Sequence, residues 1–157
     1  MIEITKELLC KLLKKIPTNA HKGANGTLSC VVGSDMYRGA ASLSIGAALR
    51  TGCGIVKLIS CENVISSVAA RHPCCTFLPV SDSVCGANSQ TLASAVYSCK
   101  NNTSAFLIGC GLGKNSEASA AVAAVAACEK KCVLDADALN IIAENPHLYS
   151  AFKGKYI

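Results

Sequence analysis

Two kinds of apolar pattern alternate along the chain. Short apolar runs closed by glycine or aspartate predict buried strands at residues 27–32, 54–60, 75–78, 105–108 and 132–134. Stretches with helical spacing lie between and around them, at residues 3–15, 39–50, 62–70, 90–98, 116–129 and 138–143. A polar loop is expected at 81–89, a break at Asn145-Pro146, and the opening of one more strand at 155–157.

The regular alternation of strands and helices predicts an α/β fold, with a mainly parallel sheet and helices on both faces. A length of 157 residues suits a single domain. In sheets of this kind, ligands bind beyond the carboxyl ends of the strands. Gly- and Asp-rich segments follow three of the predicted strands, so these three tips are the candidates for function.

The first tip, residues 33–41, joins a strand to the start of a helix, where free backbone N–H groups can hold an anion. It is not a Walker A loop, because five residues separate Gly33 from Gly39 and Ala40 stands where lysine is required. A tight turn before a helix explains the same residues equally well.

The second tip, residues 109–113, contains three glycines, but Lys114 stands where the dinucleotide fingerprint needs its third glycine. It is either a glycine turn or a backbone surface that a flat or phosphorylated ligand can approach closely. The third tip carries Asp135 and Asp137, which could orient a metal–phosphate complex. We expect Asp137 to cap the following helix, which leaves Asp135 as the functional candidate.

Charge and composition favour some classes of function and disfavour others. The net charge of +5 suits a phosphate-bearing small molecule, and no basic stripe interleaved with aromatics points to nucleic acid. No run of eighteen apolar residues predicts a membrane span, and the N-terminus does not have the pattern of a signal peptide, so we expect a cytoplasmic protein. His21 could meet a phosphate, whereas His72 and His147 are expected on the surface.

The sequence contains eleven cysteines, an odd number that cannot all pair within one chain. No Cys-x-x-Cys pair occurs among them. We therefore expect reduced, mostly buried thiols that pack as small apolar side chains, rather than disulfides or a zinc site.

Taken in order, these segments resemble the ADP-dependent NAD(P)H-hydrate dehydratase family. The matching segments are residues 21–23 with Gly26, 33–35, 39–41, 47–54, 108–113 and 134–140. Each is weak alone, but the ordered set covers nearly the whole chain. Two departures are Cys110, where the family usually has proline, and Cys53, where alanine is commoner.

The resemblance implies a ribokinase-like fold and the repair of hydrated NADH or NADPH at the expense of ADP or ATP, with Mg²⁺ as a candidate metal. The ring hydroxyl of the hydrate would be phosphorylated, and phosphate would then leave, pushed by the ring nitrogen. By resemblance, the hydrate site would be lined by Ala41, Gly109, Gly111 and Gly113. The phosphate or metal region would contain Asp135, Lys22 and Gly39.

The family also has a later Thr-Pro-His segment and a Gly-Thr-Gly-Asp loop that supplies the base and an anion hole. No Gly-x-Gly-Asp occurs in this sequence, so we expect one truncated domain over residues 1–157 that is inactive alone. The resemblance implies homo-oligomerisation or association with the missing C-terminal part. Two alternatives stay open: a ribokinase-like small-molecule kinase, and a non-catalytic dinucleotide-binding module.

Overall fold

A computed structural model describes residues 3–13, 16–81 and 90–154 of the chain. Its strands are β1 (Thr27–Val31), β2 (Ile55–Cys61), β3 (Thr76–Val80), β4 (Ala105–Ile108) and β5 (Lys131–Leu134). Its α-helices are α1 (Lys6–Leu12), α2 (Arg38–Arg50), α3 (Glu62–Ala69), α4 (Leu92–Cys99), α5 (Ser116–Ala127), α6 (Asp137–Glu144) and α7 (Pro146–Phe152). Two short 3₁₀ turns, η1 (Lys22–Asn25) and η2 (Lys100–Asn102), precede β1 and β4.

The strands form one parallel sheet in the order β3-β2-β1-β4-β5. Leu28 of β1 is in register with Val56 of β2 on one side and with Ala105 of β4 on the other. The chain therefore builds outward from β1 to β3, and then returns to the other side of β1 to add β4 and β5. This reversal creates a topological switch point between β1 and β4, the place where α/β sheets bind their ligands.

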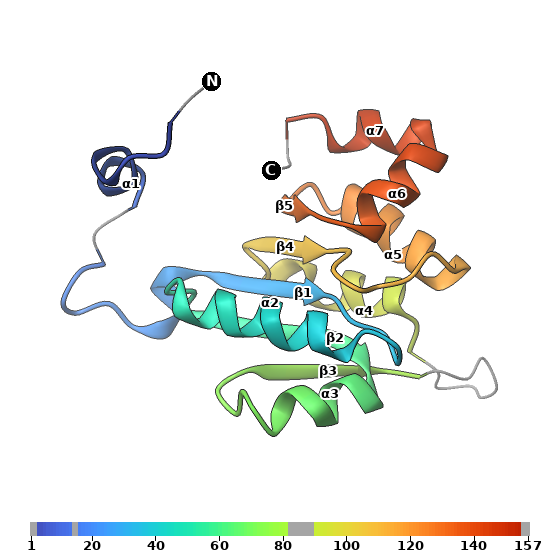
Figure 1. Ribbon diagram of the computed structural model, residues 1–157, viewed down its shortest axis with the longest axis horizontal. Coiled ribbons are helices and arrows are strands. Elements are labelled where there is room, and N and C mark those ends of the chain that lie inside the picture. The colour runs from blue at the N-terminus through green and yellow to red at the C-terminus, as the bar shows by residue number, and fades with distance from the viewer. Residues whose placement is uncertain (1–2, 14–15, 82–89, 155–157) are drawn as a thin grey trace.

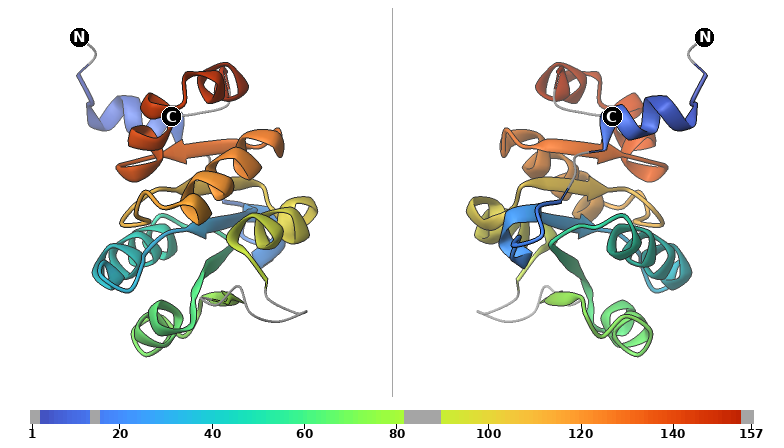
Figure 2. Two further views of the ribbon diagram at one scale, coloured as in Figure 1. Left: turned by 90° about the vertical axis from the view of Figure 1, so that its right-hand side faces the viewer. Right: turned by 90° about the vertical axis from the view of Figure 1, so that its left-hand side faces the viewer.

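Helices cover both faces of the sheet, as the alternating sequence pattern predicts. Figure 2 shows α2 and α3 on one face and α4 and α5 on the other. Consecutive residues at the end of β1 face opposite ways. Cys30, and Val32 directly after the strand, belong to the core under α2 and α3, whereas Val31 belongs to the core under α4 and α5. The sheet thus separates two apolar cores.

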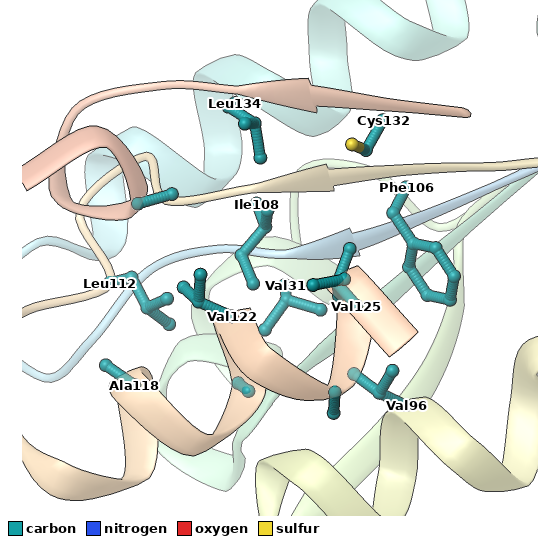
Figure 3. Packing of buried hydrophobic residues seen from close by; sticks show 14 of the residues in the cluster. Val31, Val96, Phe106, Ile108, Leu112, Ala118, Val122, Val125, Cys132 and Leu134 are labelled. Atoms are coloured by element: carbon teal, nitrogen blue, oxygen red, sulfur yellow. The ribbon is translucent and has the colours of Figure 1, made fainter. Parts of the chain in front are cut away.

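The core under α5 contains branched aliphatic side chains, alanines and two phenylalanines, Phe106 and Phe152. Val122 and Val125 of α5 pack toward Val31, Phe106 and Ile108 of the sheet (Figure 3). Each fully buried side chain of this kind stabilises the fold by roughly 1.5–3 kcal/mol. The alanines of α5 add little area, but they let the helix lie close to the strands.

The N-terminal helix is shorter than the sequence pattern predicts. α1 covers fewer residues than the predicted 3–15, and Figure 1 shows it set apart from the sheet. Thr5 caps it, since its hydroxyl accepts the N–H of Leu8 over 3.2 Å. Ile4, Leu9 and Leu13 stay exposed, so the apolar side of this helix does not join either core.

The C-terminal segment holds a helix that the sequence pattern missed. Pro146 was expected to break the chain, but it begins α7. Proline fits the first turn of a helix because its missing N–H would have no partner there. Leu148 and Phe152 bury this helix against the core under α5. The strand predicted at 155–157 and most of the predicted loop at 81–89 lie outside the described residues.

The cysteines are less uniformly buried than expected. Among those described, Cys30, Cys61, Cys75, Cys99 and Cys132 are buried, while Cys10 and Cys74 are exposed. In the described part of the chain, no helix combines the length and apolar character needed to cross a membrane.

Candidate functional site

The tips after β1 and β4 meet at the switch point. The N–H of Gly33 donates to the carbonyl of Cys110 over 2.9 Å, which joins the two loops. Gly33 has a left-handed φ of +81°, and a Cβ there would lie 2.8 Å from the Cβ of Ala41 and 2.9 Å from Cγ1 of Val64. Only glycine therefore lets the first tip turn so close beneath α2 and α3.

Gly109 and Gly111 fill packing positions. A Cβ on Gly109 would collide with the carbonyl of Asp135 and lie 2.7 Å from the backbone nitrogen of Ala138. A Cβ on Gly111 would lie 2.7 Å from the Cβ of Tyr37 at the start of α2. Both glycines allow a close approach of neighbouring segments, so the packing of the loop requires glycine at each position.

Gly113 and Gly39, in contrast, face open space, and a Cβ on either would meet nothing within 4 Å. The N–H of Gly113 donates to Oδ2 of Asp137 over 2.8 Å. Asp137 is the first residue of α6 rather than its cap, and the cap position, Ala136, makes no side-chain bond. The predicted capping role of Asp137 is therefore wrong, because its carboxylate holds the glycine loop instead.

Ala41 and Lys22 lie away from these open positions. Ala41 is completely buried beside Gly33, so its side chain supports the tip from below. Lys22 lies in η1, before β1, where Gly54 packs against its carbonyl. This loop is at the amino ends of the strands, so the structure does not bring Lys22 together with Asp135 and Gly39.

The histidines have mainly structural surroundings. Nδ1 of His21 accepts the N–H of Gly23 over 3.2 Å, which closes the η1 turn. His72 was expected on the surface but is half-buried, because Nε2 bonds to the hydroxyl of Ser42 over 3.2 Å and Gly46 leaves room for the ring. His147 is exposed, as expected.

Asp135 is exposed at the end of β5, next to the switch point. The thiol of Cys110 donates to its Oδ2 over 3.3 Å. Burial raises the pKa of Cys110, and the carboxylate of Asp135 raises it further while Ser44 lowers it. The thiol therefore keeps its proton and acts as a donor to Asp135, a bond that proline could not make. Ala136, next in the chain, has a φ of +45°, a strained conformation of the kind that clusters at functional sites.

A cavity of about 440 Å³ opens at the carboxyl ends of β1, β2 and β3. Its polar lining consists of Ser34, Asp35, Ser60, Ser81, Thr91, Asn115 and Glu117, with apolar walls from Met36, Tyr37, Val80, Leu92 and Leu112. None of the described residues that line it is a lysine or an arginine. Gly33 and Gly113 reach its edge, whereas Gly109, Gly111 and Asp135 do not line it.

Side chains cap two of the four helix N-termini around this cavity. The Thr91 hydroxyl accepts the N–H of Ser94 over 3.1 Å in α4, and Asn115 Oδ1 accepts the N–H of Ala118 over 2.8 Å in α5. Glu117 also accepts the N–H of Leu92 over 3.1 Å. α2 and α3 have no side-chain cap, so their first turns are the ones left open to an anion.

The first tip is tied down on the side of α3. Arg38 lies 3.3 Å from Oδ1 of Asp35, and Asn63 donates to the same oxygen over 2.9 Å. The sequence analysis missed Ser60, Thr91, Asn115 and Glu117. Their positions at a strand end and in the capping turns of two helices were the signals that could have found them.

The sequence pattern of the NAD(P)H-hydrate dehydratase family matches residues 28–157. This chain belongs to the NAD(P)H-hydrate dehydratase family. Its relatives include an ATP-dependent (S)-NAD(P)H-hydrate dehydratase from Emericella nidulans, 32% identical over 95% of this chain and 44% of the relative. An ADP-dependent (S)-NAD(P)H-hydrate dehydratase from Lactococcus lactis is 37% identical over 46% of this chain and 26% of the relative. The chain thus spans less than half the length of these relatives.

Solved structures agree with the fold. A ribokinase-like superfamily protein from Enterococcus faecalis superposes with a TM-score of 0.77 over 91% of this chain and 48% of that chain, at 20% identity. An ADP/ATP-dependent NAD(P)H-hydrate dehydratase from Bacillus subtilis, co-crystallised with ATP/Mg²⁺, gives 0.70 over 86% of this chain and 46% of that chain, at 27% identity. The family and the ribokinase-like fold expected from the sequence are both confirmed.

Proposed function

We propose that this chain forms the hydrate-binding part of an ATP- or ADP-dependent (S)-NAD(P)H-hydrate dehydratase, which repairs damaged NADH or NADPH. The observation that carries the proposal is the junction of the two glycine loops, bonded from Gly33 to Cys110 over 2.9 Å at the switch point. This junction occurs in a chain of the dehydratase family, and it leaves open backbone beside exposed carboxylates.

The accessible and the closely packed residues of this site have different roles. Gly113 and Gly39 present backbone that a dinucleotide can approach, and the uncapped first turn of α2 suits its pyrophosphate. Gly109, Gly111 and Ala41 hold that surface in place from below. The contact proposed for Ala41 is therefore indirect, and no role in phosphate binding is proposed for Lys22.

The reaction begins when the ring hydroxyl of the hydrate attacks the terminal phosphorus of ATP or ADP and loses its proton to a base, while the bond from that phosphorus to its bridging oxygen breaks and ADP or AMP leaves. The phosphate ester then breaks at its C–O bond, the lone pair of the ring nitrogen expels phosphate, and the neighbouring carbon loses a proton to restore the double bond. Mg²⁺ bound to a nucleotide takes one or two carboxylates besides the phosphates, and Asp135, exposed at the end of β5, would supply one of them.

Among the described residues, β5 pairs with β4 alone, which leaves its other edge open. An open edge is a template for further strands. We propose that more of the same domain, or a second copy of the chain, completes the sheet there, and that the protein works in the cytoplasm. Analytical ultracentrifugation of the chain alone and mixed with the second half of a relative tests this association.

The proposed function is tested by comparing the same substitution at a glycine in the site, Gly113, and at a glycine outside it, Gly154. Hydrated NADH is titrated into the parent chain, Gly113→Val and Gly154→Val, and heat is measured. Both glycines have a positive φ and open surroundings, but Gly154 follows α7, away from the site. We expect Gly113→Val to weaken binding about tenfold, which corresponds to about 1.4 kcal/mol, and Gly154→Val to leave it unchanged.

Equal affinity of Gly113→Val and the parent chain would contradict the site. A protein of the relatives' full length should also recover NADH absorbance when ATP or ADP is added. Consumption of nucleotide with a phosphorylated vitamin or sugar, and no such recovery, would favour the small-molecule kinase instead.

A further inference from the structure

Ser60 is a buried polar residue of the cavity wall. Ser60 lies near the end of β2, lines the cavity and is only 3% exposed. No hydrogen bond of the described residues involves its side chain. Every fully buried side-chain oxygen of the described residues has a partner, so the Ser60 oxygen is accessible from the cavity. Buried hydroxyls in proteins are almost always hydrogen-bonded. A hydroxyl that faces a cavity without a partner therefore points to a ligand in that cavity.

The lining indicates what chemistry that ligand has. The volume of about 440 Å³ suits one ring system with a sugar, and Met36, Tyr37 and Leu92 offer apolar walls to a flat ring. The polar groups are hydroxyls and carboxylates that accept hydrogen bonds, and the described lining has no cation. The helix N-termini of α4 and α5 are already capped, whereas those of α2 and α3 carry no side-chain cap. The side of the cavity at α4 and α5, where Glu117 lies, therefore favours an uncharged nucleoside and disfavours phosphate.

The strand order gives the orientation of a dinucleotide. The cavity lies at the ends of β1, β2 and β3, whereas Asp135 lies at the end of β5 on the other side of the switch point. Resting on the proposed function, the reacting nicotinamide ring faces Asp135 and the pyrophosphate crosses at the first turn of α2. The adenosine end of the dinucleotide then falls at the cavity.

We infer that this cavity holds the adenosine end of the dinucleotide and discriminates against a phosphate on its ribose, so that the NADH-derived hydrate is preferred. Sites that accept the 2′-phosphate place an arginine near it. Here the carboxylates of Asp35 and Glu117 line the cavity instead. Arg38 pairs with Asp35, but no ion pair of the described residues involves Glu117, so Glu117 supplies the repulsion.

The experiment measures binding of adenosine, adenosine 2′-phosphate, NADH and NADPH to the chain at low ionic strength. We expect each unphosphorylated member to bind roughly five- to tenfold more tightly than its 2′-phosphorylated counterpart. Glu117→Gln keeps an oxygen that can accept the N–H of Leu92, and should reduce this ratio to within about twofold by tightening the phosphorylated probes. Glu7→Gln, the same change on the remote helix α1, should leave the ratio unaltered.

Ser60→Ala tests the second contact. It should weaken adenosine and adenosine 2′-phosphate alike, by roughly two- to tenfold, because both lose one hydrogen bond. The ratio between them should not change. Circular dichroism and thermal melting of each variant confirm that the chain is folded before affinities are compared.

Several results would overturn the inference. One is equal binding of adenosine and adenosine 2′-phosphate to the parent; another is an unchanged ratio in Glu117→Gln. If hydrated NADH binds but this discrimination is missing, the inference fails and the proposed function stands. If adenosine binds with the expected ratio but hydrated NADH does not bind, the nucleoside cavity stands and the proposed function fails.

Discussion

The two ends of the glycine loop after β4 have opposite surroundings. At Gly109 and Gly111 the backbone touches the β5–α6 turn and the start of α2, so no space remains for a side chain. At Gly113, two residues further on, the same left-handed backbone faces open space. Some glycines of one loop are therefore required for packing, whereas others leave the backbone accessible to a ligand. Only the tertiary neighbours of each glycine show which of these two roles it has.

The largest expected effect separates these two ends. Gly109→Ala should lower the free energy of unfolding by roughly 3 kcal/mol or more, since its Cβ collides with backbone as well as straining φ. Gly113→Ala should lower it by only about 1–2 kcal/mol, the strain of a left-handed residue alone. Urea unfolding followed by circular dichroism measures both. An equal decrease in the free energy of unfolding for both variants would contradict the distinction between a packed and an accessible end of the loop.

A second test probes the closely packed layer under α2 and α3 through its buried thiols, Cys30 and Cys75. Burial raises the pKa of Cys75 from 9.0 to about 11, and burial likewise raises that of Cys30. The folded chain keeps these protons longer than the unfolded chain does. The stabilisation is therefore complete below pH 9 and lost as the pH rises toward 11.

For Cys75 alone this loss amounts to about 2 kcal/mol between pH 9 and 11. Unfolding measured across this range under reducing conditions should show the fall, and Cys75→Val should reduce it. Cys10→Val, at an exposed thiol of α1, is the control that should leave the slope unaltered. A flat profile in the parent chain would contradict the tight packing of this layer.

The smallest effect on stability is expected for the hydrogen bond between Asp137 and Gly113, which tethers the accessible end of the glycine loop. Asp137→Ala removes the 2.8 Å bond to the N–H of Gly113 and should lower the free energy of unfolding by about 1 kcal/mol. Asn140→Ala, on the same helix and exposed, should change it by less than about 0.5 kcal/mol. Faster hydrogen exchange at Gly113 in Asp137→Ala alone would confirm the tether, and equal exchange in both variants would argue against it.

Much of the fold could be predicted because it depends on local pattern. Strands that end at glycine or aspartate and helices rich in alanine repeat along the chain, and the parallel sheet follows from their alternation. The break predicted at Pro146 was wrong because proline, which disrupts the interior of a helix, is well tolerated in the first turn. The exposure of α1 could not be predicted, because its amphipathic pattern says nothing of what it packs against.

The site was less predictable. Asp137 was misjudged because its partner, Gly113, is 24 residues away in sequence. Ser60 and Glu117 belong to no sequence motif. They line the same cavity only because β2 ends and α5 begins at the same edge of the sheet. Lys22 was a different error, since a loop that precedes a strand lies at the amino-end edge and the sequence alone allowed that inference.

The measurement that tests the account most directly is a two-dimensional NMR titration of the ¹⁵N-labelled chain with hydrated NADH. The account predicts amide shifts at the open glycines, Gly39 and Gly113, and at Ser60 near the end of β2. It predicts no shift at Lys22 and Gly23, on the amino-end edge. Shifts confined to Lys22 and Gly23, with none at the carboxyl ends of the strands, would contradict it.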